Sequence, residues 1–195
     1  MLASEAQGRV ASRMHRVQAI RTYLRMSSPS ELRPRRVADP DVVVQRLNPC
    51  TSAEYRVLYR EVGGAWHWHD RDAWSDDRLS AHLRRDAVSI FELRVKGELA
   101  GYFELEVHDQ GDVEILYFGL VAAFFGRGLG AHLLTVAVEE AWRLGATAVR
   151  LNTCTLDHPA ALANYRARGF TPFREEHYEQ LIPDPAEAEA ERHGS

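Results

Sequence analysis

Two absences limit what this chain can be. No apolar run within its 195 residues reaches the roughly 18 residues that a membrane-spanning helix needs, and its first residues lack the apolar core of a secretion signal. Cysteine occurs only as Cys50 and Cys154, which is too few for a disulfide framework and lacks the spacing of a metal site. We therefore expect a soluble, cytoplasmic protein in a reducing compartment, with no membrane partner and no bound metal.

Charge is modest overall but unevenly distributed. The net charge is −4, whereas residues 1–36 contain eight arginines against Glu5 and Glu31. Such a basic arm can contact nucleic acid, but a solvated amphipathic segment is the more common case, so nucleic acid is disfavoured as a partner. With 45% hydrophobic residues, the chain is long enough for one domain with a sizeable core. A homodimer is left open.

The apolar periodicity predicts an N-terminal extension followed by one domain. Apolar residues recur every three to four positions from Arg9 to Met26, which predicts a helix, and two prolines mark a linker after it. We therefore assign residues 1–36 to a basic helical extension and linker. The compact domain is placed at 37–182, and an acidic, flexible tail at 183–195.

Within the domain, strand-like and helix-like patterns alternate. Strands are expected at 41–47, 87–95, 99–107, 113–120, 148–154 and 171–182, and helices at 52–63, after 75, at 130–144 and at 157–168. Thr51 and Glu54 have the spacing of a capping box at the start of the first of these helices. In the strand 113–120, strict alternation puts Glu114 and Phe118 on one face and Tyr117 on the other.

The connection Ala65–Trp74 has an unusual composition for a loop. It holds three of the four tryptophans of the chain together with two histidines. Zinc is disfavoured here because His67 and His69 supply only two ligands. Two interpretations stay open: the large side chains form a wall of an acceptor pocket, or the tryptophans fill the seam between two helices. The candidates for the acceptor wall are Trp66, His67, Trp68 and Trp74.

The stretch Gly126-Arg127-Gly128-Leu129-Gly130-Ala131 follows a strand and opens a helix. Glycines let a phosphate approach the backbone closely, and the free N–H groups of a helix start attract anions. A Walker loop is excluded because no Gly-Lys-Ser/Thr ends the run. A dinucleotide fingerprint is disfavoured because the next strand ends in Asn152-Thr153-Cys154 rather than in an acidic residue. The stretch therefore predicts a diphosphate cradle of another kind.

The run Tyr117–Ala131 and the later pattern Ala161-x-x-x-Tyr165-x-x-x-Gly169-Phe170 resemble the GNAT superfamily of acetyl-CoA-dependent N-acetyltransferases. The order of elements extends this resemblance over residues 41–182. It implies an α+β fold, layered α/β/α, in which a mixed, twisted, mostly antiparallel sheet of about seven strands carries helices on both faces. The N-terminal helical extension is added to this core. The strands 113–120 and 148–154 are expected to splay apart.

The resemblance also implies a site for acetyl-CoA, and hence for coenzyme A. The pantetheine arm would pair with the backbone of Phe118, Gly119 and Leu120, while the diphosphate would rest on Gly126 to Ala131. Two positions depart from the family pattern. Phe125 stands where arginine or glutamine is usual, and His158 stands where many members carry asparagine. The His158 ring can still donate or accept a hydrogen bond to the pantetheine arm.

Acetyl transfer to an amine needs a base and an acid. An alkylamine with a pKa of about 10.4 must lose a proton, and a thiolate leaving group, with a thiol pKa of about 8.5, benefits from a proton donor. By its position in the family pattern Tyr165 is the expected acid. We favour Glu114 as the base, with Glu104 and His158 as alternatives. A backbone N–H near Leu120 would stabilise the developing negative charge.

We therefore expect an N-acetyltransferase that moves an acetyl group from acetyl-CoA to a primary amine by direct attack in a ternary complex. The acceptor is a small molecule or a residue of a peptide or protein. An acidic pocket suited to aminoglycoside-type acceptors could be formed by Asp70, Asp72, Glu104 and Glu106. The alternative is a non-catalytic acyl-CoA-binding regulatory module whose basic arm contacts nucleic acid or a protein.

Overall fold

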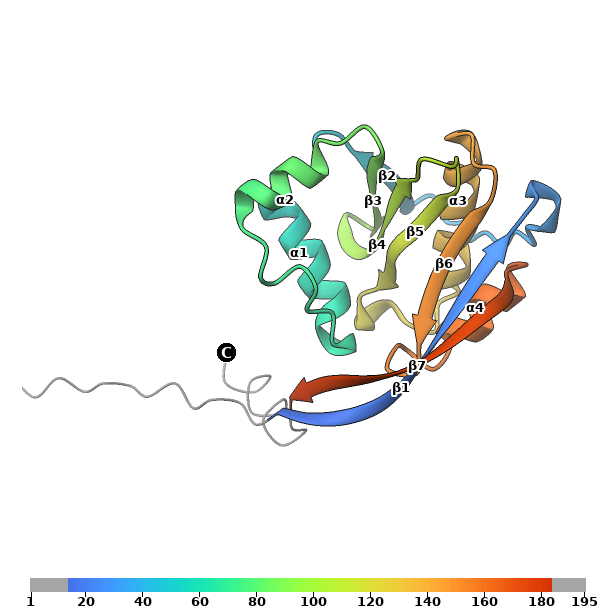
Figure 1. Ribbon diagram of the computed structural model, residues 1–195. Coiled ribbons are helices and arrows are strands. Elements are labelled where there is room, and N and C mark those ends of the chain that lie inside the picture. Colours follow the sequence, from blue (N-terminus) through green and yellow to red (C-terminus); the bar gives the residue numbers. More distant parts are fainter. Residues whose placement is uncertain (1–13, 184–195) are drawn as a thin grey trace, which may run out of the picture. The chain divides into compact units, whose positions relative to one another are not determined.

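The computed structural model describes residues 14–183 (Figure 1). The chain divides into two compact units. The larger comprises residues 20–176, and the smaller comprises 1–19 with 177–195, of which 14–19 and 177–183 are described. The predicted domain limit near Val37 coincides with neither border, and the predicted tail, from residue 184 on, lies outside the described residues.

A seven-stranded sheet organises the fold in the order β2-β3-β4-β5-β6-β1-β7. Its strands are β1 (Met14–Met26), β2 (Val42–Leu47), β3 (Val88–Val95), β4 (Glu98–Val107), β5 (Val113–Leu120), β6 (Val149–Cys154) and β7 (Thr171–Pro183). The pairs β2·β3, β3·β4, β4·β5 and β6·β1 are antiparallel, whereas β5 and β6 run parallel. This arrangement confirms the predicted α+β fold with a mixed, mostly antiparallel sheet.

The predicted N-terminal helix is wrong for residues 14–26, which form strand β1, and residues 9–13 lie outside the described part of the chain. Residues Arg21–Met26 pair antiparallel with Val149–Cys154. Thr22, Leu24 and Met26 are buried, so every second side chain here faces the core, as in a strand. The same stretch also has apolar residues at the three-to-four spacing of a helix. Pairing with β6 satisfies the backbone of β1, and this tertiary contact overrides the helical pattern.

Within residues 14–183, two helices cover each face of the sheet. The helices α1 (Ser52–Gly63) and α2 (Asp76–Leu83) pack on one face, and α3 (Leu129–Arg143) and α4 (Ala161–Ala167) pack on the other (Figure 1). Short 3-10 turns are η1 (Pro29–Glu31), η2 (Gly64–Trp66) and η3 (Ala122–Phe124). The capping box is confirmed: Thr51 and Glu54 satisfy each other's backbone N–H groups, a motif worth about 1 kcal/mol.

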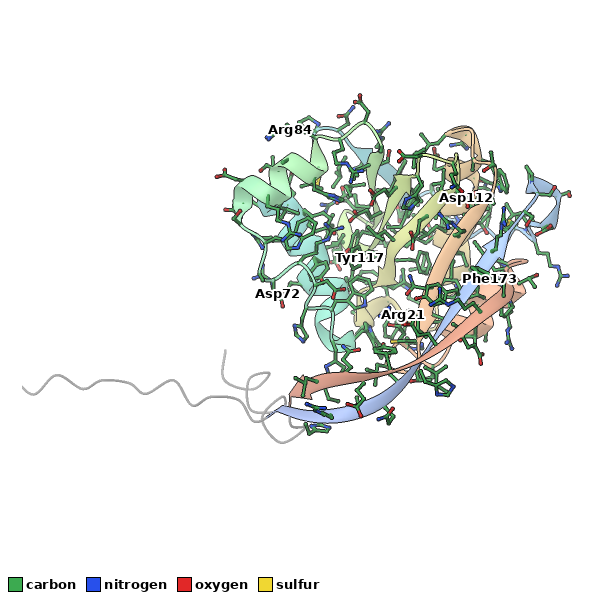
Figure 2. The ribbon with its side chains drawn as sticks, viewed as in Figure 1. Arg21, Asp72, Arg84, Asp112, Tyr117 and Phe173 are labelled. Atoms are coloured by element: carbon green, nitrogen blue, oxygen red, sulfur yellow. The ribbon has the colours of Figure 1, made fainter. Side chains whose placement is uncertain are left out.

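Two apolar clusters correspond to these faces. The α3 face is centred on residues such as Phe103, Leu105 and Leu133, and the α1 face on tyrosines, including Tyr55 and Tyr102. Figure 2 shows Tyr117 inside the layer between β5 and α1, whereas the exposed Asp72 lies on the outer loop. Among residues 14–183, no helix is long and apolar enough to cross a membrane.

The helix predicted from Asp157 begins later, at Ala161. The carboxylate of Asp157 instead accepts hydrogen bonds from the Thr153 hydroxyl at 2.7 Å and from the Cys154 N–H at 2.8 Å. It therefore caps the end of β6 rather than the start of α4, and His158 and Pro159 fall in the connecting turn. This places His158 at the carboxyl end of β6.

Candidate functional site

The strands β5 and β6 pair over only two residues each. Their register joins Val113 to Val149 and Glu114 to Arg150, and no further pairs follow along the two strands. The predicted splay between these strands is therefore confirmed. From residue 115 to residue 120, the edge of β5 that faces β6 is left without a neighbouring strand, which opens a gap with a free backbone edge along it.

A bulge in β5 corrects the predicted strand faces. In the register with β4, Glu104 lies opposite Tyr117 while Leu105 lies opposite Ile115, so Leu116 is an extra residue. The alternation slips by one at this position. As a result Glu114 shares its face with Tyr117 and Gly119, on the α1 side, and not with Phe118 as strict alternation predicted. Phe118 and Leu120 pack on the α3 side.

The predicted cradle lies at the end of this gap, where α3 begins. Gly126 and Gly128 adopt positive φ angles of 75° and 76°, which L side chains rarely tolerate. Gly128 is the N-cap of α3, no side chain caps the helix, and its first turn contains no acidic residue. The first N–H groups of α3 are thus available to an anion. The exposed Arg127 stacks on Phe124, with 5.2 Å from Cζ to the ring centroid.

The rest of the predicted cradle is the first turn of α3, formed by Leu129, Gly130 and Ala131. Asn164 of α4 donates from its Nδ2 to the Gly130 carbonyl at 3.2 Å, which ties the two helices together at this end. The two glycine conformations and the uncapped helix start fit a bound diphosphate, because they leave backbone N–H groups open to an anion. A residue with a side chain at position 128 would be strained in this backbone conformation.

The two departures from the family pattern contact each other. The ring of Phe125 lies 4.8 Å from that of His158, measured between centroids, and Trp66 of η2 lies 5.2 Å from His158 and 6.3 Å from Phe125. Phe125 follows the end of β5 and His158 follows the end of β6. The contact therefore joins the two sides of the gap, and Trp66 brings the tryptophan-rich loop to the same place.

His158 also borders a cavity of about 220 Å³ beside β1, β6 and the start of α4. This volume lies below the roughly 300 to 1,000 Å³ of typical ligand pockets, so it can hold only part of a cofactor. Its lining consists of Ile20, Thr22, Thr153, Cys154, Thr155, Asp157, His158, Pro159 and Leu162.

Tyr165 projects from α4 into the apolar layer on the α3 side. Its ring packs edge-on against Phe118, with 5.9 Å between centroids, and against Phe170 at 6.4 Å. Burial raises the pKa of the Tyr165 hydroxyl above its ordinary value, and the nearby Asp157 carboxylate acts in the same direction. The hydroxyl therefore stays protonated at neutral pH, as a proton donor must.

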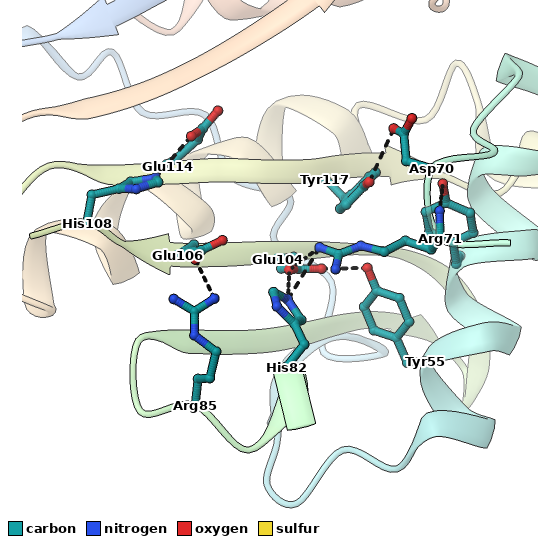
Figure 3. A network of polar contacts seen from close by, with 11 residues as sticks. Tyr55, Asp70, Arg71, His82, Arg85, Glu104, Glu106, His108, Glu114 and Tyr117 are labelled. Atoms are coloured by element: carbon teal, nitrogen blue, oxygen red, sulfur yellow. Dashed lines mark hydrogen bonds and ion pairs between the residues drawn. The ribbon is translucent and has the colours of Figure 1, made fainter. Parts of the chain in front are cut away.

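Glu114 lies where the gap begins. Its Oε2 is 3.0 Å from Nε2 of His108 (Figure 3). Asn152 donates from Nδ2 to its Oε1 at 3.5 Å. The side chain keeps 23% of its surface exposed, so solvent can reach the carboxylate. Glu114 thus combines partial exposure with a position on the same face as the tryptophan-rich loop.

The alternative base, Glu104, is enclosed in a polar network on the α1 side (Figure 3). Its side chain has no exposed surface. Oε1 accepts a hydrogen bond from Arg71 Nη2 at 3.0 Å and lies 2.7 Å from His82 Nε2, while Oε2 accepts from the Tyr55 hydroxyl at 2.5 Å. With these three partners and no solvent contact, Glu104 is suited to hold structure rather than to take a proton from a substrate.

Arg71 and His82 did not emerge from the sequence. Arg71 lies in the tryptophan-rich loop and passes between two aromatic rings, with its Cζ 4.0 Å from the Trp74 centroid and 5.2 Å from that of Tyr117. The contact between Arg71 and the buried Glu104 joins the loop to β4, and these two segments are far apart in the sequence. The sequence alone therefore does not reveal it. The sole hint was Glu104 itself, a charged residue between Phe103 and Leu105 in a strand.

Arg71→Met is expected to cost about 3 kcal/mol of unfolding free energy, because it leaves Glu104 buried without its cationic partner. The matched control is Arg78→Met. Its Cζ also lies 4.0 Å from the Trp74 ring, but Arg78 is exposed, so the loss should stay below about 1 kcal/mol. Urea unfolding followed by circular dichroism measures both. Equal losses in the two variants would show that the buried pair does not anchor the loop.

The tryptophans of the loop have different surroundings. Trp68 and Trp74 pack on the α1 side against aromatic and cationic side chains, which matches the seam interpretation. Trp66 instead packs against His158 at the end of the gap, and His67 adopts a left-handed conformation with φ of 57°. Asp70 is exposed and accepts a hydrogen bond from the Tyr117 hydroxyl at 3.4 Å. The loop therefore borders the gap on the side of Tyr117 and Glu114.

A family model and a curated relative match this chain. The family model of the acetyltransferase (GNAT) family matches residues 52–170. A curated relative, the mycothiol acetyltransferase of Corynebacterium efficiens, is 33% identical over 124 residues, covering 57% of this chain and 41% of that protein. The chain thus spans less than half the length of this relative.

Solved structures share the fold. A GCN5-related N-acetyltransferase from Sphaerobacter thermophilus superposes with a TM-score of 0.63 at 15% identity, covering 88% of this chain and 54% of that one. An aminoglycoside acetyltransferase from an uncultured soil metagenomic sample, in complex with sisomicin, gives a TM-score of 0.56 at 17% identity, covering 76% of this chain and 97% of that one. At these identities the likeness concerns the fold alone.

Proposed function

We propose, because this chain belongs to the acetyltransferase (GNAT) family, that it transfers an acetyl group from acetyl-CoA to a primary amine. The observation that carries the proposal is the gap between β5 and β6, which leads from Glu114 to the glycine cradle at the start of α3. A free strand edge and an uncapped helix start together suit an extended amide-containing arm that ends in a diphosphate.

The chain's own groups supply the binding. The free edge of Phe118, Gly119 and Leu120 pairs with the pantetheine arm as a neighbouring strand would. The N–H groups from Gly128 to Ala131 bind the diphosphate, and Arg127 adds positive charge. His158 borders the arm from the β6 side and can donate or accept a hydrogen bond. When bound, acetyl-CoA supplies the thioester that the amine attacks.

The proton acceptor and the proton donor of the reaction lie on opposite faces of the sheet. The amine enters on the α1 side, where Trp66, His67, Trp68 and Trp74 wall the approach. Glu114 on that side takes a proton from the ammonium, either directly or through water, so that the free amine can attack the thioester. Tyr165 on the opposite side protonates the departing thiolate, and a backbone N–H near Leu120 stabilises the negative charge that develops on the thioester oxygen. Attack occurs directly, within a ternary complex.

Purified protein should release free CoA from acetyl-CoA in the presence of at least one amine. The panel includes alkylamines, amino thiols, peptides and an aminoglycoside such as sisomicin, with free CoA separated from acetyl-CoA by chromatography. Absence of both acetyl-CoA binding by calorimetry and CoA release would reject the proposal. Binding without release for every amine would favour the non-catalytic acyl-CoA-binding module instead.

Glu114→Gln should lower kcat/KM for the best amine about 100-fold, because general-base catalysis commonly contributes 10² to 10⁴. Glu139→Gln is the matched control, since Glu139 lies on α3, pairs with Arg36 and keeps 26% of its side-chain surface exposed, close to the 23% of Glu114. It should change kcat/KM less than about threefold, in line with a mere surface ion pair. If both substitutions have the same effect in steady-state assays, Glu114 is not the base.

A further inference from the structure

We infer that Trp68 limits the length of the acyl group that this site accepts, and so selects acetyl over longer acyl donors. This inference rests on the proposed function, because it takes the pantetheine arm to lie along Phe118–Leu120. It concerns the donor rather than the amine.

Two glycines let the Trp68 indole lie between α1 and β5. A Cβ built on Gly63, at the end of α1, would be 2.2 Å from Trp68 Cε3, so no other residue fits there without moving the ring. A Cβ on Gly119 would be 2.6 Å from Cγ1 of Val62 and 3.7 Å from Cη2 of Trp68, the outer edge of the indole. The ring therefore spans from the helix to the backbone of β5.

The contact falls at the middle of the three residues proposed to pair with the pantetheine arm. Because Gly119 has no side chain, a methyl of Val62 fills the place of a side chain on that strand face, and the indole edge lies next to it in van der Waals contact. The face is the one that carries Tyr117 and Glu114, from which the amine approaches. The gap closes at Glu114, where β5 and β6 begin to pair. An acyl chain that extends toward this face meets the indole.

The indole is held too firmly to yield to a longer chain. Its centroid lies 5.1 Å from that of Tyr117, 5.8 Å from that of Tyr59 and 6.2 Å from that of Tyr102. Tyr59 and Tyr102 are buried, so these neighbours cannot retreat into solvent. Displacing a ring packed on three sides costs contacts that a few extra methylenes cannot restore.

The other two tryptophans of the loop do not take this position. Trp66 packs on Phe125 and His158, past the carboxyl end of β5. Trp74 stacks on Arg71 and Arg78, on the outer side of the network around Glu104. Trp68 is thus the member of the loop whose ring edge faces Gly119.

Calorimetric binding of free CoA, acetyl-CoA and butyryl-CoA tests the inference without knowledge of the amine. The native chain should bind butyryl-CoA at least about 10-fold more weakly than acetyl-CoA, the lower end of what pocket size achieves per methylene. Trp68→Ala should narrow this ratio to within about threefold, and Trp68→Phe should give an intermediate ratio. Free CoA, which has no acyl group, should bind the native chain and both variants equally.

Trp142→Phe is the matched control, because Trp142 lies on α3 and packs in the other apolar cluster. It should leave the butyryl-to-acetyl ratio at the native value. If Trp68→Ala fails to fold, Trp68→Phe still decides the question. Equal binding of both donors by the native chain, or an unchanged ratio in the folded Trp68 variants, would overturn the inference alone. Failure of the native chain to bind any CoA species would overturn the proposed function together with it.

Discussion

Tyr165→Phe is expected to lower kcat for acetyl transfer by about 100- to 1,000-fold, because the departing thiolate loses its proton donor. The phenylalanine ring keeps the packing against Phe118 and Phe170, so the fold and the Kd for acetyl-CoA should be nearly unchanged. Steady-state kinetics and calorimetry on the same preparation separate the two effects.

Tyr23→Phe serves as the control for loss of a tyrosine hydroxyl. The Tyr23 hydroxyl donates to Glu176 Oε2 at 2.7 Å, and its loss should cost about 1 kcal/mol of stability without changing kcat. A Tyr165→Phe variant with native kcat would exclude Tyr165 as the acid and leave it as a packing residue of α4.

The pH dependence of Tyr165 follows from the direction of its pKa shift. Burial, helped by Asp157, raises the pKa in the folded chain above the ordinary value of about 10. The protonated hydroxyl and the stability linked to it are therefore fully present below about pH 10, and are lost only as the pH rises through the folded pKa. Tyr165 therefore does not titrate between about pH 7 and 9. If kcat declines over this range, the residual kcat of Tyr165→Phe should decline with the same pH profile as that of the native chain.

Gly128→Ala is expected to weaken CoA binding about 100-fold, a loss of about 2.7 kcal/mol. Gly128 has a φ of 76°, and an L residue is strained there by about 1 to 2 kcal/mol. Relief of that strain would rotate the first turn of α3 and move its N–H groups away from the diphosphate. Calorimetry with free CoA measures the effect directly.

Gly145→Ala is the matched control at the opposite end of α3. Gly145 has a φ of 84° and, like Gly128, no close neighbour around a built Cβ, so the two substitutions should cost similar stability. Only Gly128→Ala should affect CoA. If both variants bind CoA as tightly as the native chain, the diphosphate does not rest on the start of α3.

Local patterns in the sequence were sufficient for most elements of the fold. The glycine stretch before α3, the capping box of Thr51 and Glu54, and the period of two in β3 and β4 each depend on neighbours a few residues apart. Such signals survive in the folded chain because they report backbone conformations that the local residues themselves favour. The cradle's position between β5 and α3 is of this kind.

The errors arose where distant segments decide the structure. Residues 14–26 carry both helical and strand spacing, and pairing with β6, more than 120 residues away, selects the strand. The bulge at Leu116 depends on the register between β4 and β5, and it moves Glu114 to the face opposite Phe118. Neither choice is visible in a window of ten residues.

Sequence alone therefore determined the order of elements from β2 to β7 and the glycine turns before α3, because backbone preferences and apolar spacing are local. The tertiary structure decided which side chains meet. It buried Glu104 against Arg71, it joined Phe125 and His158 across the gap, and it set the edge of Trp68 on Gly119. These contacts link residues 33, 33 and 51 positions apart, and only the packing of helices on a splayed sheet brings them together.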